Sequence, residues 1–369
     1  MKILVTGAKG FIGRNLIIGL KNHKDMEIYE YDKDTKQSLL EEYCKDADFV
    51  YHLAGVNRPI DEEQYIENNI DFTIQLLKAL KNNNNPCPLV YSSSVQASLN
   101  NSYGKSKKAG EDAIFNYAIE TGSKVLVYRL PNVFGKWCKP NYNSVVATFC
   151  NNIAKDLPIT VNEPDTALRL VYIDDVVEEF IHALKGEECK AGAFCKIPTV
   201  HMMSIGGIAD LIRSFKSSRE KLAIPDMSDA FTKKLYSTYL SYLPDWDLSQ
   251  ELKMNVDQRG SFTEFIKQTE IGQVSINISK AGIIKGNHWH NTKIEKFLVV
   301  SGIGVIRIRK ITSKEVISYY VDGEKLQIID IPAGYAHNIE NLGKRELITM
   351  IWANESFDPS KPDTYSMEV

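Results

Sequence analysis

The sequence predicts an α/β domain followed by an all-β domain, and three observations lead to this fold class. The chain has 369 residues, more than one ordinary domain usually contains. Up to about residue 215, apolar strand-like runs alternate with helical patterns. After about residue 256 the helical patterns stop, and short strands lie between Gly, Asn and Asp turns. We therefore place the two domains at residues 1–245 and 253–369.

The first domain is expected to form a doubly wound parallel sheet with helices on both faces, because strands and helices alternate along it. Strands are expected at 2–6, 26–32, 47–55, 88–94 and 124–131, and helices at 11–22, 39–44 and 68–82.

The second domain is expected to be an antiparallel sandwich or barrel. Its strand-like runs are SFTEFI, GQVSINIS, EKFLVVSG, GVIRIRK, VISYYVD, KLQIIDIP and ELITMIWA. The mixed segment 216–255, rich in Tyr and Ser, is interpreted as a tether packed on one or both domains.

Composition excludes several classes of function. The formal net charge of −3 and the lack of a long basic run argue against nucleic acid as a partner. No stretch approaches 18 apolar residues, so no membrane span is expected. The N-terminal MKILVTGAKGF lacks the apolar core and cleavage site of a signal peptide. Six scattered cysteines without a CxxC pair suit a reducing compartment, so we expect a cytoplasmic protein.

TGAKGFIG (6–13) indicates a dinucleotide site, because it follows the first strand and opens the first helix. Gly7 permits the tight turn, Gly10 lets the backbone approach a pyrophosphate, and Gly13 lets helix and strand pack closely. The pyrophosphate would lie at the helix N-terminus, beside Phe11 and Ile12.

The residues leave the choice between NAD and NADP open. Asp32 closes the second strand, where a carboxylate that binds a ribose is expected. Lys33 follows it and Lys9 lies in the glycine loop, and either could meet a 2′-phosphate.

YSSSVQA (91–97) and YGKSK (103–107) suggest an acid–base site. Tyr103 and Lys107 are four apart, so they share one face of a helix. A lysine ammonium there is expected to lower the phenol pKa and to hold the cofactor ribose. The tyrosine could then exchange a proton with a substrate oxygen, and a serine hydroxyl from the strand end could bind the same oxygen.

Together, TGAKGFIG, HLAG (52–55), YSSS, YGKSK, RLPNVFG (129–135) and YIDDVV (172–177) resemble the extended short-chain dehydrogenases/reductases that act on nucleotide sugars. The resemblance covers residues 1–215. It implies a Rossmann-like fold and hydride transfer at a sugar carbon, usually C4. By motif position it implies catalytic residues (Ser94, Tyr103, Lys107), of which Tyr103 and Lys107 also bind the cofactor. It further implies cofactor contacts (Leu53, Ala54, Gly55) and substrate contacts (Asn132, Arg169).

Three histidines and a glutamate predict a metal site in the second domain. His288 and His290, two apart on a strand, share a face, and Glu295 lies near the start of the next strand. His337 is the fourth candidate. Imidazole and carboxylate together suit Zn, Fe, Mn or Ni. The metal could be structural or could polarise a substrate oxygen.

The strings around these residues, G-x5-H-x-H-x4-E-x6-G and P-x-G-x2-H-x3-N, resemble the two motifs of the cupins over residues 260–355. This implies a small β-barrel that binds a metal through all four side chains. DQRGSFTEF (257–265) also resembles a motif of the nucleotide-sugar 3,5-epimerases, in which the position of His288 is the base. A ligand cannot also be a free base, so the base stays unassigned, with Lys296 and Tyr335 as guesses.

The whole chain, with KWCKPNYNS (136–144) and YSTYLSYLP (236–244), resembles bifunctional capsule-synthesis enzymes that join such a reductase to a cupin. This implies C3 epimerisation of a UDP-linked 2-acetamido-2,6-dideoxy-4-hexulose and reduction at C4 with NADPH, in a zinc-containing homodimer. The product would be UDP-2-acetamido-2,6-dideoxy-L-talose, a precursor of UDP-N-acetyl-L-fucosamine. Two alternatives remain, a single-function reductase with a structural or dimerising cupin and a regulator that only senses the cofactor.

Overall fold

The computed structural model describes residues 1–23, 25–57, 61, 63–268, 271–356, 358, 360 and 362–369, and these form two compact units. The N-terminal unit comprises Met1–Arg213 and Ser228–Pro244, and the C-terminal unit comprises Ser214–Met227 and Asp245–Val369. The segment expected to be a single tether is thus shared between the units. Within the described residues, no helix combines the length and the hydropathy that a membrane crossing requires.

The N-terminal unit contains a seven-stranded sheet in the order β2-β1-β3-β4-β5-β9-β8. Its strands are β1 (Lys2–Thr6), β2 (Glu27–Tyr31), β3 (Phe49–His52), β4 (Leu89–Ser94), β5 (Val125–Leu130), β8 (Lys190–Ala191) and β9 (Phe194–Cys195). All neighbouring strands pair in parallel except β8 and β9. The chain moves from β1 outward to β2 and then back to β3, and ligands of such sheets bind at the carboxyl ends beside this reversal.

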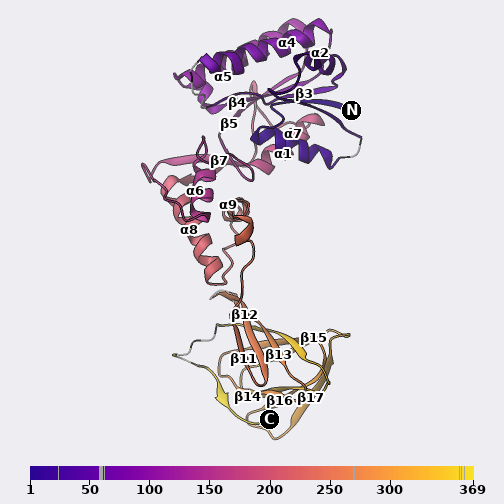
Figure 1. Ribbon diagram of the computed structural model, residues 1–369, viewed down its shortest axis with the longest axis vertical. Helices are drawn as coiled ribbons and strands as arrows, with labels where there is room; N and C mark the ends of the chain where they lie inside the picture. The colour runs from indigo at the N-terminus through magenta and orange to yellow at the C-terminus, as the bar shows by residue number, and fades with distance from the viewer. Residues whose placement is uncertain are drawn as a thin grey trace. The chain divides into compact units, whose positions relative to one another are not determined.

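Helices cover both faces of this sheet, which confirms the predicted doubly wound α/β fold. Figure 1 shows α4 and α5 over one face and α1 and α7 over the other. The helices of the unit and its boundary are α1 (Phe11–Lys21), α2 (Gln37–Asp46), α3 (Glu63–Tyr65), a π-helix (Ile66–Asp71), α4 (Phe72–Asn82), a 3₁₀ turn (Val95–Ser98), α5 (Ser102–Thr121), α6 (Val145–Ala154), α7 (Ile173–Leu184), α8 (Ile205–Glu220) and α9 (Ala230–Leu240).

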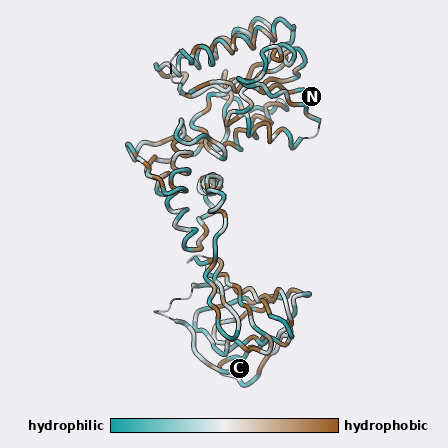
Figure 2. Tube along the Cα trace, in the orientation of Figure 1, coloured by the Kyte–Doolittle hydropathy of each residue, from teal (hydrophilic) through white to brown (hydrophobic). Residues whose placement is uncertain are grey.

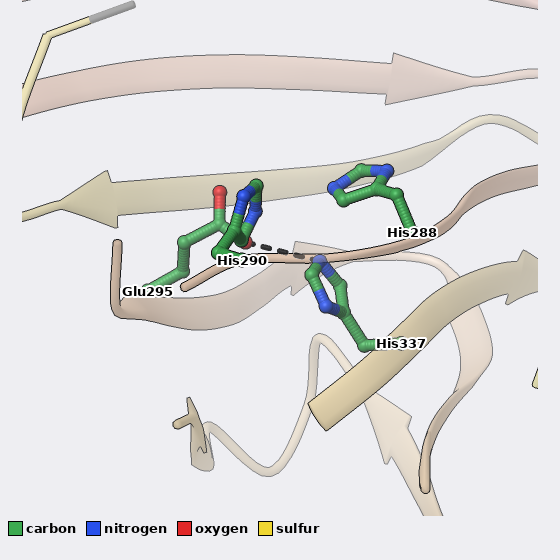
Figure 3. Close-up of side chains that lie close together, drawn as sticks. All are labelled: His288, His290, Glu295 and His337. Atoms are coloured by element: carbon green, nitrogen blue, oxygen red, sulfur yellow. Dashed lines mark ion pairs between the residues drawn. The ribbon is translucent and has the colours of Figure 1, made fainter. Parts of the chain in front are cut away.

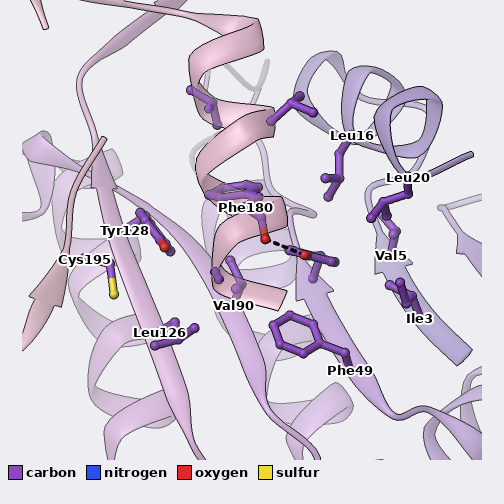
Figure 4. Packing of buried hydrophobic residues seen from close by; sticks show 14 of the residues in the cluster. Ile3, Val5, Leu16, Leu20, Phe49, Val90, Leu126, Tyr128, Phe180 and Cys195 are labelled. Carbon is purple, nitrogen blue, oxygen red and sulfur yellow. Dashed lines mark hydrogen bonds between the residues drawn. The ribbon is translucent and has the colours of Figure 1, made fainter. Parts of the chain in front are cut away.

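The core has two halves because successive strand residues point to opposite faces of the sheet. Ile3 and Val5 pack with α1 and α7, whereas Leu4 packs with α2 and α4. Figure 4 shows the first half, where Leu16 and Phe180 meet the strands. The continuous apolar run of β1 is therefore explained by burial on both faces.

A smaller sheet was not expected from the sequence. Its order is β10-β7-β6, and its strands are β6 (Asn132–Phe134), β7 (Ala167–Tyr172) and β10 (His201–Ser204). β6 begins two residues after β5 ends, so this sheet extends from the carboxyl edge of the main sheet, where the reactive groups are expected.

The C-terminal unit contains two antiparallel sheets, in the orders β11-β12-β13-β20-β15-β18 and β17-β16-β19-β14-β21. The strands are β11 (Met254–Asp257), β12 (Gly260–Gln268), β13 (Gly272–Ser279), β14 (Ile284–Trp289), β15 (Glu295–Ser301), β16 (Ile303–Lys310), β17 (Val316–Asp322), β18 (Ile328–Ile331), β19 (Tyr335–Asn341), β20 (Leu347–Ala353) and β21 (Tyr365–Ser366). The all-β prediction is confirmed, and closure into a cupin barrel stays a prediction.

One strand of this unit has an unusual polarity. On β13 the buried positions are polar, namely Gln273, Ser275, Asn277 and Ser279, and the apolar residues between them are partly exposed. Figure 2 shows hydrophilic and hydrophobic residues mixed along the strands of this unit. β13 therefore gives the cavity beside it a polar wall, and an apolar cluster with residues of β15, β16 and β19 packs in the same unit.

Candidate active sites

The glycine turn connects β1 to α1 and packs against the segment after β3. Gly7 has a φ of +70°, which favours glycine, and a Cβ on Gly13 would lie 2.2 Å from the Gly7 carbonyl oxygen. Gly10 is the N-cap of α1 and has no side chain to occupy the helix N-terminus. Because the first amides of a helix lack intrahelical acceptors, this end suits a pyrophosphate. Phe11 and Ile12 form the first turn of α1, at that end.

The segment HLAG lies against the same turn. The Leu53 amide donates to the Thr6 carbonyl at 3.2 Å, and the Ala54 amide approaches the Thr6 hydroxyl at 3.4 Å. A Cβ on Gly55 would lie 3.1 Å from Lys107 Nζ. The glycine loop, HLAG and Lys107 therefore converge at one edge of the sheet.

Asp32 faces the glycine loop, as a ribose-binding carboxylate would. Its Oδ2 accepts from the Lys9 amide at 2.8 Å, and its Oδ1 accepts from the Lys33 amide at 2.9 Å. The Lys9 ammonium pairs with Asp34 at 3.1 Å on the exposed surface. Asp32, which suits a free ribose, and Lys9, which suits a 2′-phosphate, both lie at the glycine loop. The choice between NAD and NADP therefore stays open.

The three serines of YSSS have different partners. Ser92 Oγ donates to the His52 carbonyl at 3.4 Å, and Ser93 Oγ donates to the buried Glu111 carboxylate at 2.6 Å. Ser94 Oγ accepts from the Gln96 amide at 3.2 Å and also hydrogen-bonds to Tyr103. Of the three, Ser94 is the serine that reaches the phenol.

The structure brings Tyr103 and Lys107 onto one face of α5, but it contradicts the expected pKa of the phenol. Burial raises the pKa of Tyr103 to about 12, and Ser94 is the group that acts most strongly to lower it. Lys107 Nζ instead donates to the Ser92 carbonyl at 3.0 Å. Burial lowers the pKa of Lys107 to about 8, and Glu111 acts in the opposite direction.

Sequence reasoning missed Asn69, which joins the HLAG segment to α5. Its Nδ2 donates to the Val56 carbonyl at 2.9 Å and to Ser106 Oγ at 3.0 Å, and its Oδ1 accepts from the Val56 amide at 2.8 Å. Asn69 is buried and belongs to the π-helix, a distortion often found at functional sites. Nothing in ENNIDFT marks this geometry, because the helical pattern continues through it.

Asn132 and Arg169 lie together on the small sheet. Asn132 pairs with Leu170 in the β6–β7 register, and its Nδ2 donates to the Arg169 carbonyl at 3.4 Å. Both residues are exposed, as groups that contact a substrate would be.

The four predicted metal ligands form one cluster in the C-terminal unit. His288, His290, Glu295 and His337 each offer a ligand atom, and these atoms all lie within 4.8 Å of one another. Figure 3 shows the side chains converging from three strands and the turn after β14. His288 lies directly opposite His337 in the β14–β19 register, beyond a bulge after Gly286. Glu295 is the first residue of β15.

The unpaired atoms of the cluster fit a metal. Within the described part of the chain, His290 Nε2, Glu295 Oε2 and His337 Nε2 are buried without a hydrogen-bond partner. Glu295 Oε2 lies 3.0 Å from His337 Nε2 and 3.5 Å from His290 Nε2, close enough for charge attraction. Buried polar atoms usually have partners, so three such atoms facing one another suit a bound cation. Three imidazoles and one carboxylate form a donor set that suits zinc and the related metals iron, manganese and nickel.

Electrostatics favour the metal-binding forms of His288 and Glu295, but not of His290: burial acts to lower the pKa of His290, and Glu295 outweighs burial and raises it. Burial lowers the pKa of His288 to about 4, and the neighbouring His337 adds to this effect. Burial acts to raise the pKa of Glu295, but His290 and His337 outweigh it and hold that pKa below its ordinary range. A neutral imidazole and an ionised carboxylate are the ligating species.

The cluster lines a cavity of about 680 Å³. The polar row of β13 (Gln273, Ser275, Asn277) lines the same cavity, together with the cations Arg259 and Lys285. Among the described residues that line it, the guessed bases Lys296 and Tyr335 are not found. The Lys296 ammonium instead pairs with Asp330, and both side chains are exposed.

A glycine turn on a parallel sheet and a Tyr–Lys pair on one helix face define a nicotinamide-dependent oxidoreductase of the short-chain type. Residues 3–193 match the model of the NAD dependent epimerase/dehydratase family, and residues 255–365 match the polysaccharide biosynthesis C-terminal domain. The chain belongs to the NAD dependent epimerase/dehydratase family.

Relatives of full length confirm the resemblance to capsule-synthesis enzymes. The chain is 40% identical over 369 residues to the UDP-2-acetamido-2,6-beta-L-arabino-hexul-4-ose reductase of Pseudomonas aeruginosa, covering 100% of this chain and 99% of the relative. It is 50% identical to the capsular polysaccharide assembling protein CapF of Staphylococcus aureus, with a TM-score of 0.94 and full coverage of both chains. CapF with the inhibitor 3-isopropenyl-tropolone matches at 48% identity, full coverage of both chains and a TM-score of 0.89.

A more distant neighbour shows the fold of the first part alone. The UDP-glucuronic acid 4-epimerase of Bacillus cereus in complex with NAD is 21% identical, with a TM-score of 0.56, and the match covers 66% of this chain and 98% of that one.

Proposed function

We propose that this chain is a bifunctional nucleotide-sugar enzyme of capsule or O-antigen synthesis. The C-terminal unit epimerises C3 of a UDP-2-acetamido-2,6-dideoxy-4-hexulose, and the N-terminal unit reduces C4 with NADPH. The product is UDP-2-acetamido-2,6-dideoxy-L-talose. The observation that carries the proposal is that one chain holds two separate reactive centres, the Ser94–Tyr103–Lys107 group and the buried histidine–glutamate cluster. The name of the 40% identical relative, a 4-keto sugar reductase, supports the substrate.

In the reduction, NADPH bound at the glycine turn supplies the hydride for C4. Tyr103 donates its proton to the C4 oxygen, which becomes a hydroxyl. Ser94, which hydrogen-bonds to the phenol, orients the same oxygen. Lys107 lies beside HLAG and holds the ribose, while Asn132 and Arg169 contact the sugar nucleotide. The high phenol pKa keeps Tyr103 protonated before the reaction, as an acid requires.

In the epimerisation, the C3 proton is acidic because the neighbouring C4 ketone delocalises the charge left behind. A divalent metal held by His288, His290, Glu295 and His337 would supply Lewis-acid stabilisation of that charge. The side chains of β13 offer hydrogen bonds to sugar hydroxyl and acetamido groups. The tropolone inhibitor of CapF supports a metal, because the adjacent oxygens of a tropolone chelate metal ions.

The remaining assignments belong to the same proposal. The metal is zinc, the cofactor is NADPH rather than NADH, and the enzyme is a cytoplasmic homodimer with domains at 1–245 and 253–369. The 50% identity to CapF supports the overall assignment.

Proton exchange tests the proposal. The chain is incubated with the UDP-4-keto sugar in D₂O without NADPH, and C3 is followed by NMR. We expect deuterium to enter C3 with the wild type and with Tyr103→Phe, but not with Glu295→Ala. Lys296→Met is the matched control, because Lys296 is adjacent to Glu295 and pairs on the exposed surface. If C3 does not exchange while NADPH is still consumed, the chain is a single-function reductase with a structural metal site.

A further inference from the structure

A single acidic residue near the C-terminus, Asp363, binds the turn that connects two of the predicted metal ligands, His290 and Glu295. The Asp363 carboxylate accepts from the amides of Asn291 (2.9 Å), Thr292 (2.7 Å) and Lys293 (3.0 Å). It also accepts from the Thr292 hydroxyl at 3.0 Å. Three successive amides around one carboxylate form an anion-binding nest. This turn leads directly from His290 to Glu295, so its shape sets the separation of two ligands.

The backbone of the same residue selects the tautomer of one ligand. The Asp363 carbonyl accepts a hydrogen bond from His290 Nδ1. A carbonyl can only accept, so the proton lies on Nδ1 and the lone pair lies on Nε2, the atom that faces Glu295. Asp363 thus acts on His290 through its carbonyl and on the following turn through its carboxylate.

The residues after Asp363 continue along the histidine strand. Ser366 lies opposite His288, and Tyr365 lies opposite Trp289 with its ring stacked at 4.8 Å. Thr364 lines the cavity beside the cluster. We call residues 363–367 the C-terminal strap, because the segment pairs with β14 at the ligand candidate His288 and at Trp289, which lies between the two histidines.

We propose that Asp363 is a positioning residue of the metal centre and that the C-terminal strap holds His290 and Glu295 in ligand geometry. This inference rests on the metal site of the proposed function. It predicts that metal affinity depends on a residue that does not itself contact the metal. A purely structural strap would affect stability instead and would leave the affinity of the folded chain unchanged.

The test measures zinc binding to the full-length wild type, Asp363→Ala and Asp363→Asn by competition with a chromophoric chelator. Asp322→Ala is the matched control, because the Asp322 carboxylate caps another turn through the amides of Glu324 (2.8 Å) and Lys325 (2.9 Å). We expect Asp363→Ala to weaken zinc binding about 10- to 100-fold, the usual effect of losing a group that orients a ligand. Asp363→Asn keeps the size of the side chain, so its zinc affinity should lie between those of the wild type and Asp363→Ala. The zinc affinity of Asp322→Ala should match that of the wild type.

Cobalt absorption and thermal melting of the metal-free chains separate the outcomes. We expect the ligand-field bands of Co²⁺ to change in Asp363→Ala, while both alanine variants melt at similar temperatures without metal. Wild-type affinity in both Asp363 variants would overturn the inference, and so would an equal loss in Asp322→Ala. If the wild type binds neither zinc nor cobalt, the metal centre itself is refuted, and the positioning role with it.

Discussion

The two candidate sites differ in how their central buried polar groups are partnered. In the N-terminal unit, Lys107 donates to a backbone carbonyl, and the Asn69 side chain makes three hydrogen bonds. In the C-terminal unit, three buried ligand atoms of His290, Glu295 and His337 face one another without hydrogen bonds among the described residues. The first site thus holds Lys107 and Asn69 by hydrogen bonds within the protein, whereas the second leaves three facing atoms that suit a bound cation.

Two buried histidines make the contrast specific. His52 has Thr6 Oγ1 at 2.8 Å from Nδ1 and Thr73 Oγ1 at 2.8 Å from Nε2, and burial lowers its pKa to about 3. His337 has the Tyr335 carbonyl at 3.4 Å from Nδ1, while Nε2 is left for Glu295. A histidine with both nitrogens satisfied supports the fold, and one with a free nitrogen aimed at a carboxylate is a ligand candidate.

The largest expected effect comes from removing the acid of the N-terminal site. Tyr103→Phe should slow NADPH oxidation with the 4-keto sugar by at least about 100-fold, the usual contribution of a positioned acid. NADPH binding, measured by fluorescence titration, should change far less than the rate, because the glycine turn is untouched. The measurement is the decay of nicotinamide absorbance under saturating substrate.

Tyr117→Phe provides the control for that prediction. Tyr117 lies on the same helix, and its hydroxyl donates to the Asn85 carbonyl at 3.2 Å. Losing this hydrogen bond should cost about 1 kcal/mol of stability and leave the rate unchanged. A Tyr103→Phe variant as fast as Tyr117→Phe would remove Tyr103 from the chemistry.

Metal removal should affect the C-terminal site alone. Adding free zinc at about 1,000 times its Kd to the chelated chain should stabilise the C-terminal unit by about 4 kcal/mol. Differential scanning calorimetry should therefore show one transition that rises with zinc and another that does not. In Glu295→Gln this transition should no longer rise with zinc, because the variant keeps the size of the side chain but lacks the carboxylate charge. Two transitions that respond equally to zinc would contradict the contrast between the sites.

The sequence predicted most of the fold because local patterns decided it. Fully buried strands such as β1 are continuous apolar runs, and the glycine turn allows few other conformations. The small sheet was missed because β6 has three residues and pairs only with the distant β7. Its existence depends on contacts across the chain, which no local window contains.

The sites were predictable where spacing fixes geometry. Tyr103 and Lys107 share a helix face, and the cupin-like spacing brought the four ligands together. The expected lowering of the Tyr103 pKa was wrong, because burial raises that pKa to about 12. Asp363 was missed because it lies 73 residues from His290, and the sequence offers no pattern that links them.

The smallest effect is a pH dependence confined to the N-terminal site. Burial lowers the pKa of Lys107 to about 8, with Glu111 acting in the opposite direction, and burial raises that of Tyr103 to about 12. As pH rises through about 8, the lysine loses its charge while the phenol keeps its proton. We expect the charged lysine to be the active form, so kcat/KM for reduction should halve near pH 8 and fall about tenfold per unit above it.

The same titration separates the two sites. C3 exchange, measured without NADPH, should not share this decline, because Lys107 belongs to the other unit. Bound NADPH adds negative charge near the lysine and favours its protonated form, so the decline in kcat should begin at a higher pH than that in kcat/KM. A reduction rate that stays flat to pH 10 would mean that the charge of Lys107 is not needed. A decline shared by both reactions would place its cause in the substrate and not in either site.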